Sequence, residues 1–253
     1  MRSERWVLPL VLAALLLGAW QLAITVTDAH VVPGPLEVLR GLDELANRGV
    51  LVGYILDSLR RVLVGFGIAV ALGVPLGLWM GLSPTVFAAV NPLIQILRPI
   101  SPIAWIPIAI VFWGIGEAAP IFLIALAGFF PIASSVPAHV REVPTMFVHA
   151  ARNFGLSTPQ IIRRALFPAV LPPLISTLRL SLGVCWIVVV AAEMIAVDSG
   201  LGYLIIDARN AGKRYDLVVA GMVLVGAVGL LLDLSFRLLE QMPSVRWGFR
   251  SHS

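Results

Sequence analysis

Residues 217–239 read LVVAGMVLVGAVGLLLDLSFRLL, an apolar run with only two charged side chains. A helix needs about 20 mostly apolar residues to cross a bilayer, so this run is long enough. The whole chain of 253 residues is 59% hydrophobic and 13% charged, whereas a soluble domain carries about 25% charged residues. Lipid must therefore solvate most of the surface. Long unbroken apolar runs exclude the alternating strands of a membrane barrel, so the sequence predicts an all-α integral membrane protein.

Six stretches have the length and apolar character of a membrane span. They are Trp6–Ile24, Leu59–Leu82, Ala88–Trp113, Ala118–Val136, Leu171–Ala196 and Leu217–Leu239. The first follows two arginines, as the apolar core of a signal peptide does, but it is longer than such a core and no small-residue cleavage site follows it cleanly. We interpret it as a retained span. The sequence contains no soluble domain and no low-complexity tract, so residues 1–253 are predicted to form one transmembrane domain.

The third predicted span is interrupted by prolines at positions 92, 99, 102 and 107. A proline removes a backbone donor and kinks a helix. Broken helices in a membrane must lie inside the protein or line a water-filled cavity, where the freed carbonyls find partners. Arg98, Ser101 and Trp105 lie in this stretch, which favours a position along a translocation path. A kinked helix that serves only packing is the alternative.

Small residues follow one face of the second span at every fourth position. They are Gly65, Ala69, Gly73, Gly77 and Gly81. Such rows let two helices approach closely in a membrane. We expect this row to form a packing seam within the chain, with a seam between two copies as the alternative.

The polar segment Thr27–Asp57 contains a shorter helical pattern. Leucines at positions 36, 39, 42 and 45 follow the turn sequence Pro33-Gly34-Pro35. This spacing predicts a short amphipathic helix that lies on the membrane surface.

Orientation is predicted from the positions of Lys and Arg, which accumulate on the cytoplasmic side of a membrane protein. Six spans place both termini on the same side as the polar segment His139–Pro168. That side carries eight basic residues and the other side seven, so the bias is small. The basic amino terminus favours cytoplasmic termini. We interpret the dispersed positive charge as a topology signal and a contact with lipid, with no nucleic acid as partner.

Apart from Arg60 and Arg61, which we count with the polar flank of the second span, five charged side chains fall within the predicted spans. They are Arg98, Arg179, Glu193, Asp233 and Arg237. Charges at this depth are costly and usually face the protein interior or a water path. Arg98, Arg179 and Asp233 lie at similar depth, and Asp233 and Arg237 are one helical turn apart. We favour a structural ion pair; the alternative is that Arg98 or Arg179 attracts an anionic substrate.

The most informative polar segment reads EVPTMFVHAARNFGLSTPQIIRRALFPAVLPP from Glu142 to Pro173. The pattern predicts a helix from Thr145 to Phe154, ended by a left-handed glycine at Gly155. Ser157 or Thr158 then caps a second helix, with a proline near its first turn. A compact helix–turn–helix between two spans has the form of a docking element. A re-entrant connector that merely closes the bundle is the alternative.

This segment resembles the EAA loop of binding-protein-dependent ABC importer permeases. That signature reads roughly E-A-A, three residues, G, and then an apolar stretch that ends in L-P. Here His149-Ala150-Ala151 is followed by Gly155, then by Ile162 and Phe167-Pro168, so His149 and Phe167 replace the family's Glu and Leu. Two further blocks, RPISPIAWIPIAIVFWGIGEAAPIF (98–122) and AAEMI followed by SGLGYLI (191–206), resemble the nitrate/sulfonate/taurine branch of the family.

The resemblance covers nearly the whole chain and implies the architecture of a type I importer permease. It implies that residues of about 138–168 form a cytoplasmic coupling loop, which sits in a groove of an ATP-binding subunit. The residues implied in coupling are His149, Ala150, Ala151, Gly155, Ile162 and Pro168. The resemblance also implies that Glu193 and the turn Gly200-Leu201-Gly202 lie near an outer gate.

The same resemblance implies the partners of the chain in the plasma (inner) membrane. The expected assembly contains two permeases, two ATP-binding subunits and an extracytoplasmic solute-binding protein. One chain of six spans is too small to make two pseudo-symmetric halves, so a homodimer is expected. The sequence has no Gly-x-x-x-x-Gly-Lys-Ser/Thr motif, so ATP must bind to the partner and the chain itself needs no cofactor. The solute implied is a small anion such as nitrate, a sulfonate or taurine.

Two other classes of protein make different predictions. An ion-coupled secondary transporter needs an inverted repeat with broken helices in both halves, and only one predicted span is broken. A membrane-embedded enzyme needs titratable residues on facing spans. The four histidines, at positions 30, 139, 149 and 252, lie outside the predicted spans and lack metal-ligand spacing, so we predict no catalytic or metal site.

Overall fold

The computed structural model describes residues 4–27 and 32–240, and this part of the chain is an assembly of helices. Its elements are α1 (Glu4–Thr27), α2 (Pro35–Asn47), α3 (Leu51–Leu82), α4 (Pro84–Leu97), η1 (Pro102–Trp105), α5 (Ile106–Trp113), α6 (Ala118–Glu142), α7 (Thr145–Asn153), α8 (Thr158–Ile161), η2 (Ile162–Leu166), α9 (Phe167–Ala196), α10 (Leu201–Gly212) and α11 (Tyr215–Glu240). The predicted fold class, all-α, is therefore confirmed.

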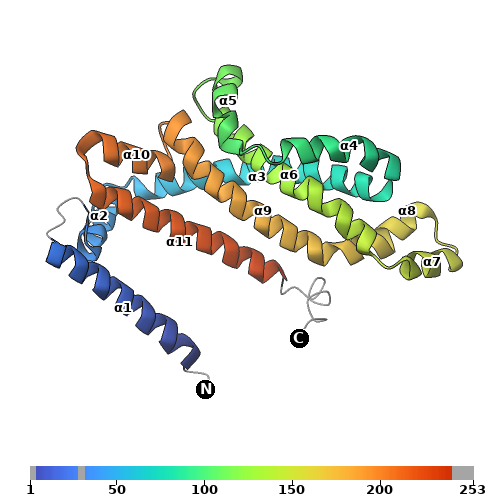
Figure 1. Cartoon of the computed structure of the whole chain (residues 1–253), viewed down its shortest axis with the longest axis horizontal. Coiled ribbons are helices and arrows are strands. Elements are labelled where there is room, and N and C mark those ends of the chain that lie inside the picture. Colours follow the sequence, from blue (N-terminus) through green and yellow to red (C-terminus); the bar gives the residue numbers. More distant parts are fainter. Residues whose placement is uncertain (1–3, 28–31, 241–253) are drawn as a thin grey trace.

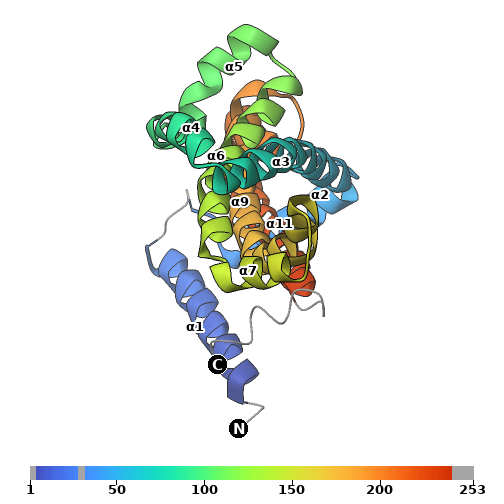
Figure 2. The same ribbon diagram turned by 90° about the vertical axis from the view of Figure 1, so that its right-hand side faces the viewer.

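Four long helices, α3, α6, α9 and α11, form a bundle whose members run lengthwise past one another (Figure 1). The short helices α2 and α10 lie at one end of this bundle, which we call the α10 end. Helices α7 and α8 lie at the opposite end, which we call the α7 end. Helix α1 stands apart from the bundle in both views (Figures 1 and 2). The two ends are therefore built from different short elements on one shared set of long helices.

The four bundle helices are each long and apolar enough to cross a membrane. They contain four of the six predicted spans, with ends that extend beyond the predicted bounds. Helix α3 begins eight residues before the predicted Leu59, and α6 continues to Glu142 rather than ending at Val136. In α1 the apolar helical stretch is Val11–Val26, which is shorter than the length of a full span, so the first span stays a prediction.

The interruption predicted in the third span is confirmed, and it is a sharp bend. Helix α4 and the pair η1–α5 pass the span test only together, and they are bent by 85° relative to each other. The physical reason lies in Pro99 and Pro102, which have no backbone N–H to continue the ladder. Ser101, which precedes one of them, is extended with ψ 132°, as a residue before proline prefers to be.

The row of small residues on α3 is an internal seam, as we expected. A Cβ atom built at Gly65 would lie 2.7 Å from Ile124, and one at Gly77 would lie 2.6 Å from Val136. Gly73 and Gly81 meet Ile132 and Val140 in the same way. Each contact is made with α6, so glycine is needed along α3 for the two helix backbones to approach.

We expect Gly65→Ala to destabilise the bundle by about 1–3 kcal/mol, because overpacking a filled helix–helix contact costs that much. Its Cβ would also lie 2.9 Å from the carbonyl oxygen of Ile121, which is backbone and has little freedom to move. Gly67→Ala is the matched control, since nothing lies within 4 Å of a Cβ at that position. Thermal unfolding of the purified protein in detergent measures both. Equal stability of the two variants would contradict the seam.

The polar segments differ in detail from their predictions. Helix α2 is present, but it buries Val38, Gly41 and Leu45, while Leu36 and Leu39 are exposed. It lies against the start of α11, where a Cβ at Gly41 would meet Leu217 at 3.2 Å. The amphipathic pattern therefore serves packing against the bundle as well as any membrane surface.

The predicted coupling loop of about 138–168 also begins later than expected. Helix α6 runs over Pro137 to Glu142, so His139 lies in the last turn of this helix, beyond the predicted end of the span at Val136. Its Nε2 atom lies 2.8 Å from Thr177 Oγ1 on α9, which anchors the end of α6 to its neighbour. His30 and His252 lie outside the described residues.

Candidate functional sites at the two ends of the bundle

The first candidate site is the loop at the α7 end, and its geometry follows the sequence closely. Helix α7 covers Thr145–Asn153, and Gly155 is left-handed with φ 74°. The backbone N–H of Ser157 donates to the side-chain oxygen of Gln160 at 2.9 Å, which closes the start of α8 as a capping box. The predicted helix–turn–helix is therefore confirmed.

Some side chains of this loop are exposed to solvent, and others are buried. Ala151 and Ile161 are buried, whereas Phe154 at the tip is 86% exposed and Met146 is also exposed. Arg152, Arg163 and Arg164 are exposed in the same loop and give it positive charge. An exposed aromatic ring at the tip of a compact, internally anchored turn is the form of a surface that fits into a partner's groove.

The predicted coupling residues do not all share one environment. Ala150, Gly155 and Pro168 are exposed, Ile162 is half-buried and Ala151 is buried. The backbone of His149 lies in α7, but its side chain lies outside the described part of the structure. Ile162 begins η2, a π-helical turn that leads into α9. Such turns often mark functional positions, and this one joins the loop to α9, one of the four long helices of the bundle.

The second candidate site is a group of polar side chains at the α10 end, which we call the Arg61 cluster. It comprises Ser58, Arg61, Glu117, Glu193 and Ser199. The Arg61 guanidinium is 1% exposed, and it donates to both oxygens of Glu117 from Nε (2.9 Å) and Nη2 (2.6 Å). Its Nη1 atom donates to Glu193 Oε1 and to the carbonyl oxygen of Ser199, each at 2.8 Å.

Arg61 is fully engaged by these contacts. A guanidinium has five N–H donors, and the fifth reaches Ser199 Oγ at 2.7 Å. The cluster joins α3, the start of α6, the end of α9 and the turn before α10. Burying a charge requires such compensation, so the four segments are held together by one arginine.

Glu193 is fully buried and caps the beginning of α10. One of its oxygens accepts the backbone N–H of Gly202 at 3.0 Å. Ser58 Oγ lies 2.8 Å from both carboxylate oxygens and accepts the N–H of Leu201 at 2.9 Å. A negative charge at the N-terminus of a helix is stabilised by the free N–H groups and the helix dipole.

The glycines of this turn are needed for the capping contact. Gly200 has φ 103°, and a Cβ there would lie 2.4 Å from the carboxylate carbon of Glu193. A Cβ at Gly202 would lie 2.2 Å from the carbonyl oxygen of Val190. Glu193, Gly200, Leu201 and Gly202, which the sequence predicted near one another, do lie together. Their role in a gate stays a prediction.

Sequence reasoning missed the other members of the cluster. The sequence predicted no site role for Ser58, Arg61, Glu117 or Ser199. One signal for Arg61 was present: it lies four residues before Gly65 and so continues the row of small residues on the buried face of α3. Because Glu117 lies outside the spans, its titration bears on the site, and the bond from Arg61 lowers the pKa of this carboxyl group.

The predicted path residues of the third span are not brought to the cluster by any described contact. Arg98 and Ser101 are exposed in the turn between α4 and η1. Trp105 is half-buried, and among the described residues its Nε1 atom has no hydrogen-bond partner. Their place along a path stays a prediction.

Arg179 lies in a structural ion pair, which was the favoured interpretation. Its Nε atom donates to Asp233 at 2.6 Å, and Nη1 donates to Glu240 at 3.1 Å. Arg237 also donates to Asp233, at 3.0 Å, one turn along α11. This network joins α9 to α11. Arg98 is not part of it in the described structure.

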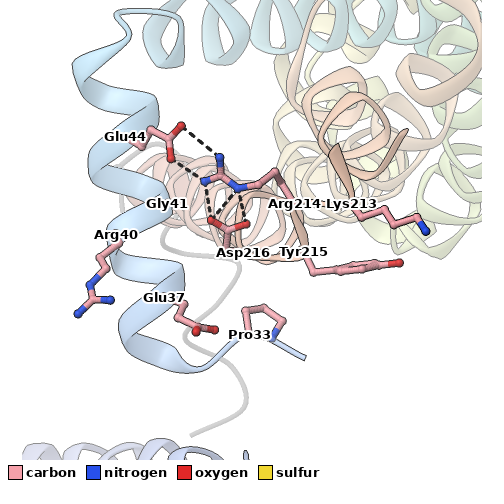
Figure 3. Close-up of a pocket in the computed structure, with 9 residues that line it drawn as sticks. All are labelled: Pro33, Glu37, Arg40, Gly41, Glu44, Lys213, Arg214, Tyr215 and Asp216. Carbon is pink, nitrogen blue, oxygen red and sulfur yellow. Dashed lines mark hydrogen bonds and ion pairs between the residues drawn. The ribbon is translucent and has the colours of Figure 1, made fainter. Parts of the chain in front are cut away.

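A third polar contact holds α2 to α11 at the α10 end. Arg214 lies between two carboxylates, with Nη2 2.6 Å from Glu44 and 2.7 Å from Asp216, beside a cavity of about 450 Å³ (Figure 3). The bond from Arg214 lowers the pKa of Glu44. The side chains of Arg40 and Lys213 on the rim point away from this pair (Figure 3), so they do not converge on a ligand. The described residues also contain no group of three or more His, Cys, Asp and Glu placed to hold a metal ion.

Comparison with known proteins decides the family. The family model for the inner membrane component of binding-protein-dependent transport systems matches residues 73–244, which is more than half of the chain. This chain belongs to that family of transport permeases. The permease is 36% identical to the taurine transport system permease TauC of Escherichia coli over 238 residues, covering 91% of this chain and 86% of TauC.

Two further relatives have similar extent. The permease is 34% identical to the nitrate import permease NrtB of Synechocystis, covering 95% of this chain and 90% of that one. It is also 34% identical to the putative aliphatic sulfonates permease SsuC of Bacillus subtilis, covering 93% and 86% of the two chains. The branch that the sequence resembled is therefore confirmed.

Solved structures support the fold independently. A chain of the MetNI methionine ABC transporter in an inward-facing conformation matches with a TM-score of 0.67 and 22% identity, over 77% of this permease and 96% of that chain. At this identity the likeness concerns the fold alone. The predicted architecture of a type I importer permease is confirmed by it.

Proposed function

We propose that the permease forms the membrane path of an ATP-driven importer for a small anion of the nitrate, sulfonate or taurine class. In this proposal residues 1–253 act as one transmembrane domain in the inner membrane and bind no cofactor, because ATP is bound and hydrolysed on a partner subunit. The relatives named for taurine, nitrate and sulfonate transport support the solute class. The observation that carries the coupling role is the loop at the α7 end, with its left-handed Gly155 and its exposed tip.

The loop is suited to dock in a groove of an ATP-binding subunit. His149, Ala150, Ala151, Gly155, Ile162 and Pro168 are the residues that we assign to this coupling. Phe154 supplies the exposed apolar anchor, and central aromatic side chains of this kind dominate the energetics of many protein interfaces. Because η2 leads directly into α9, a displacement of the docked loop is transmitted to a helix that reaches the Arg61 cluster at its other end.

We assign the remaining path and gate roles as follows. Glu193, Gly200, Leu201 and Gly202 form the outer gate at the α10 end, which faces an extracytoplasmic solute-binding protein. Arg98, Ser101 and Trp105 line the approach along the bent pair α4–α5, and the Arg179 network stabilises the inner half of the bundle. Two copies of the chain face each other as a homodimer, in contact with lipid on their remaining surfaces.

The purified permease alone is expected not to hydrolyse ATP above background, because the chain has no phosphate-binding loop motif. Adding the ATP-binding subunit should restore hydrolysis, and adding the loaded binding protein should increase it further. Release of inorganic phosphate measures each step. Robust hydrolysis by the permease alone would contradict the proposal.

Both termini and the α7 end are proposed to be cytoplasmic. A cysteine at Asn153, in the coupling loop, should then react with a membrane-impermeant thiol reagent only from the cytoplasmic side, and one at Asn210 only from outside. Both side chains are exposed. The single native cysteine, Cys185, is buried in the bundle, so its background reaction is small. The reverse labelling pattern would invert the orientation.

The alternative of an ion-coupled secondary transporter has no specific observation in its favour. It predicts broken helices in both halves of the chain. In the described part, the bent pair α4–α5 is a single occurrence.

A further inference from the structure

The two carboxylates on Arg61 differ sharply in their exposure to solvent. Glu193 is fully buried, whereas the Glu117 side chain is 45% exposed. Glu193 also accepts bonds from Ser58 and the start of α10, so its removal from Arg61 would leave several buried donors without partners. The Glu117 carboxylate accepts its described hydrogen bonds from Arg61 alone. The Glu193 carboxylate is therefore fixed, whereas water can replace the hydrogen bonds that the Glu117 carboxylate loses when it leaves Arg61.

Glu117 also has a second cation within reach. Arg60 Nη2 lies 3.9 Å from Glu117 Oε2, and the Arg60 side chain is 64% exposed. A small rotation of the Glu117 side chain exchanges one arginine for the next. The Gly116 N–H donates to the carbonyl oxygen of Ala196 at 2.9 Å, so the exchange is a motion of the Glu117 side chain on an anchored backbone. Half-exposed ion pairs are weak, so the exchange is inexpensive.

When Glu117 turns to Arg60, the Nε and Nη2 edge of Arg61 is left open. This edge is a planar fork of two parallel donors, which matches the spacing of two oxygens in an oxyanion. Glu193, Ser199 and the backbone of α3 keep the guanidinium in place, so the fork does not need to be organised when a ligand arrives. An exposed arginine such as Arg98 lacks this fixation.

We propose that Glu117 is an exchangeable occupant of the Arg61 fork, and that a small oxyanion (a carboxylate, a sulfonate or nitrate) takes its place with two oxygens on Nε and Nη2. Glu117 then pairs with Arg60. This site rests on the proposed function, and it gives the transported anion a first binding position in the membrane at the α10 end. Neutral solutes and cations cannot replace a carboxylate on this fork.

The test uses a cysteine in place of Glu117, in the assembled transporter with Cys185→Ala. Two methanethiosulfonate reagents of similar size, one carrying a sulfonate and the other a trimethylammonium group, are compared. We expect the sulfonate reagent to react about fivefold faster, because Arg61 attracts it. Nitrate, methanesulfonate and acetate should each slow the labelling, whereas choline chloride at equal ionic strength should not.

Three control variants make the result specific. Ile115→Cys lies in the same connection and is exposed, so its labelling should be unaffected by the three anions. Arg60→Gln added to Glu117→Cys should leave the anion protection in place, whereas Arg61→Lys should remove it, because an ammonium group keeps the charge and loses the fork. If Arg61→Lys does not assemble, the comparison of positions 115 and 117 still decides the outcome.

The exchange of Glu117 for an anion is tested with Glu117→Gln, whose side chain has the same shape as the native one. Glu117→Gln removes the competing charge, so the anion concentration that half-maximally raises the unfolding temperature of the transporter should fall about fivefold relative to the unaltered protein. No protection by any of the three anions at position 117, or an unchanged half-maximal concentration in Glu117→Gln, would overturn the proposal. Neither measurement requires transport, so loss of uptake and loss of this site are distinguishable.

Discussion

Glu193→Ala is expected to lower the free energy of unfolding of the permease by about 3–5 kcal/mol, because it leaves the buried arginine at position 61 with an unpaired donor. The same change removes the acceptor for the Ser58 hydroxyl and for the N–H of Gly202 at the start of α10. Helix α10 should therefore detach from the bundle before the remaining helices unfold. Unfolding by titration with SDS in detergent micelles measures the loss.

Glu117→Ala is the matched control, since it removes the other carboxylate from the same guanidinium. Its side chain is 45% exposed, so water replaces the lost bonds and the loss should be about 1 kcal/mol or less. Glu193→Gln should fall between the two, because the amide retains an acceptor oxygen but not the charge. Equal losses in the two alanine variants would mean that burial does not distinguish the two ion pairs.

The spans and the coupling loop could be predicted because their signals are local. The apolar run 217–239 lies within α11, and the left-handed residue, the cap and the proline of the loop each act within one or two turns of the backbone. The Arg179–Asp233 pair was also foreseeable, since depth along a helix follows from counting residues. Such features depend little on where the other helices lie.

The Arg61 cluster could not be predicted in full because its partners are far apart in sequence. Arg61 reaches Glu117 and Glu193, which are 56 and 132 residues away. Arg60 and Arg61 lie at the edge of an apolar run, where adjacent arginines are typical of the charged residues that flank a membrane span. The periodicity that continues from Arg61 to the small residues of α3 marked its buried face, but periodicity does not name the partner. Likewise the prolines predicted an interruption in the third span, but they did not predict the size of the bend, which is 85°.

Gly155→Val is expected to abolish uptake while the protein remains inserted in the membrane. Gly155 has φ 74°, a conformation that costs a non-glycine residue about 1–2 kcal/mol, and β-branched side chains tolerate it least. This cost is enough to distort the turn between α7 and α8 but not to unfold the long helices. The distorted loop should no longer fit the ATP-binding subunit, so co-purification of the two subunits should weaken together with transport.

Gly155→Asn distinguishes two reasons for a glycine at this position, which are its left-handed backbone and the space that a docked partner needs. Asparagine adopts left-handed backbone more readily than other residues, and nothing in the permease lies within 4 Å of a Cβ there. If backbone strain is the cause, Gly155→Asn should retain co-purification and uptake. If the asparagine variant fails as the valine variant does, the side chain obstructs the docked partner directly, which places position 155 within the interface. Normal co-purification and uptake by Gly155→Val would instead make the loop a mere connector and remove the main support for its coupling role.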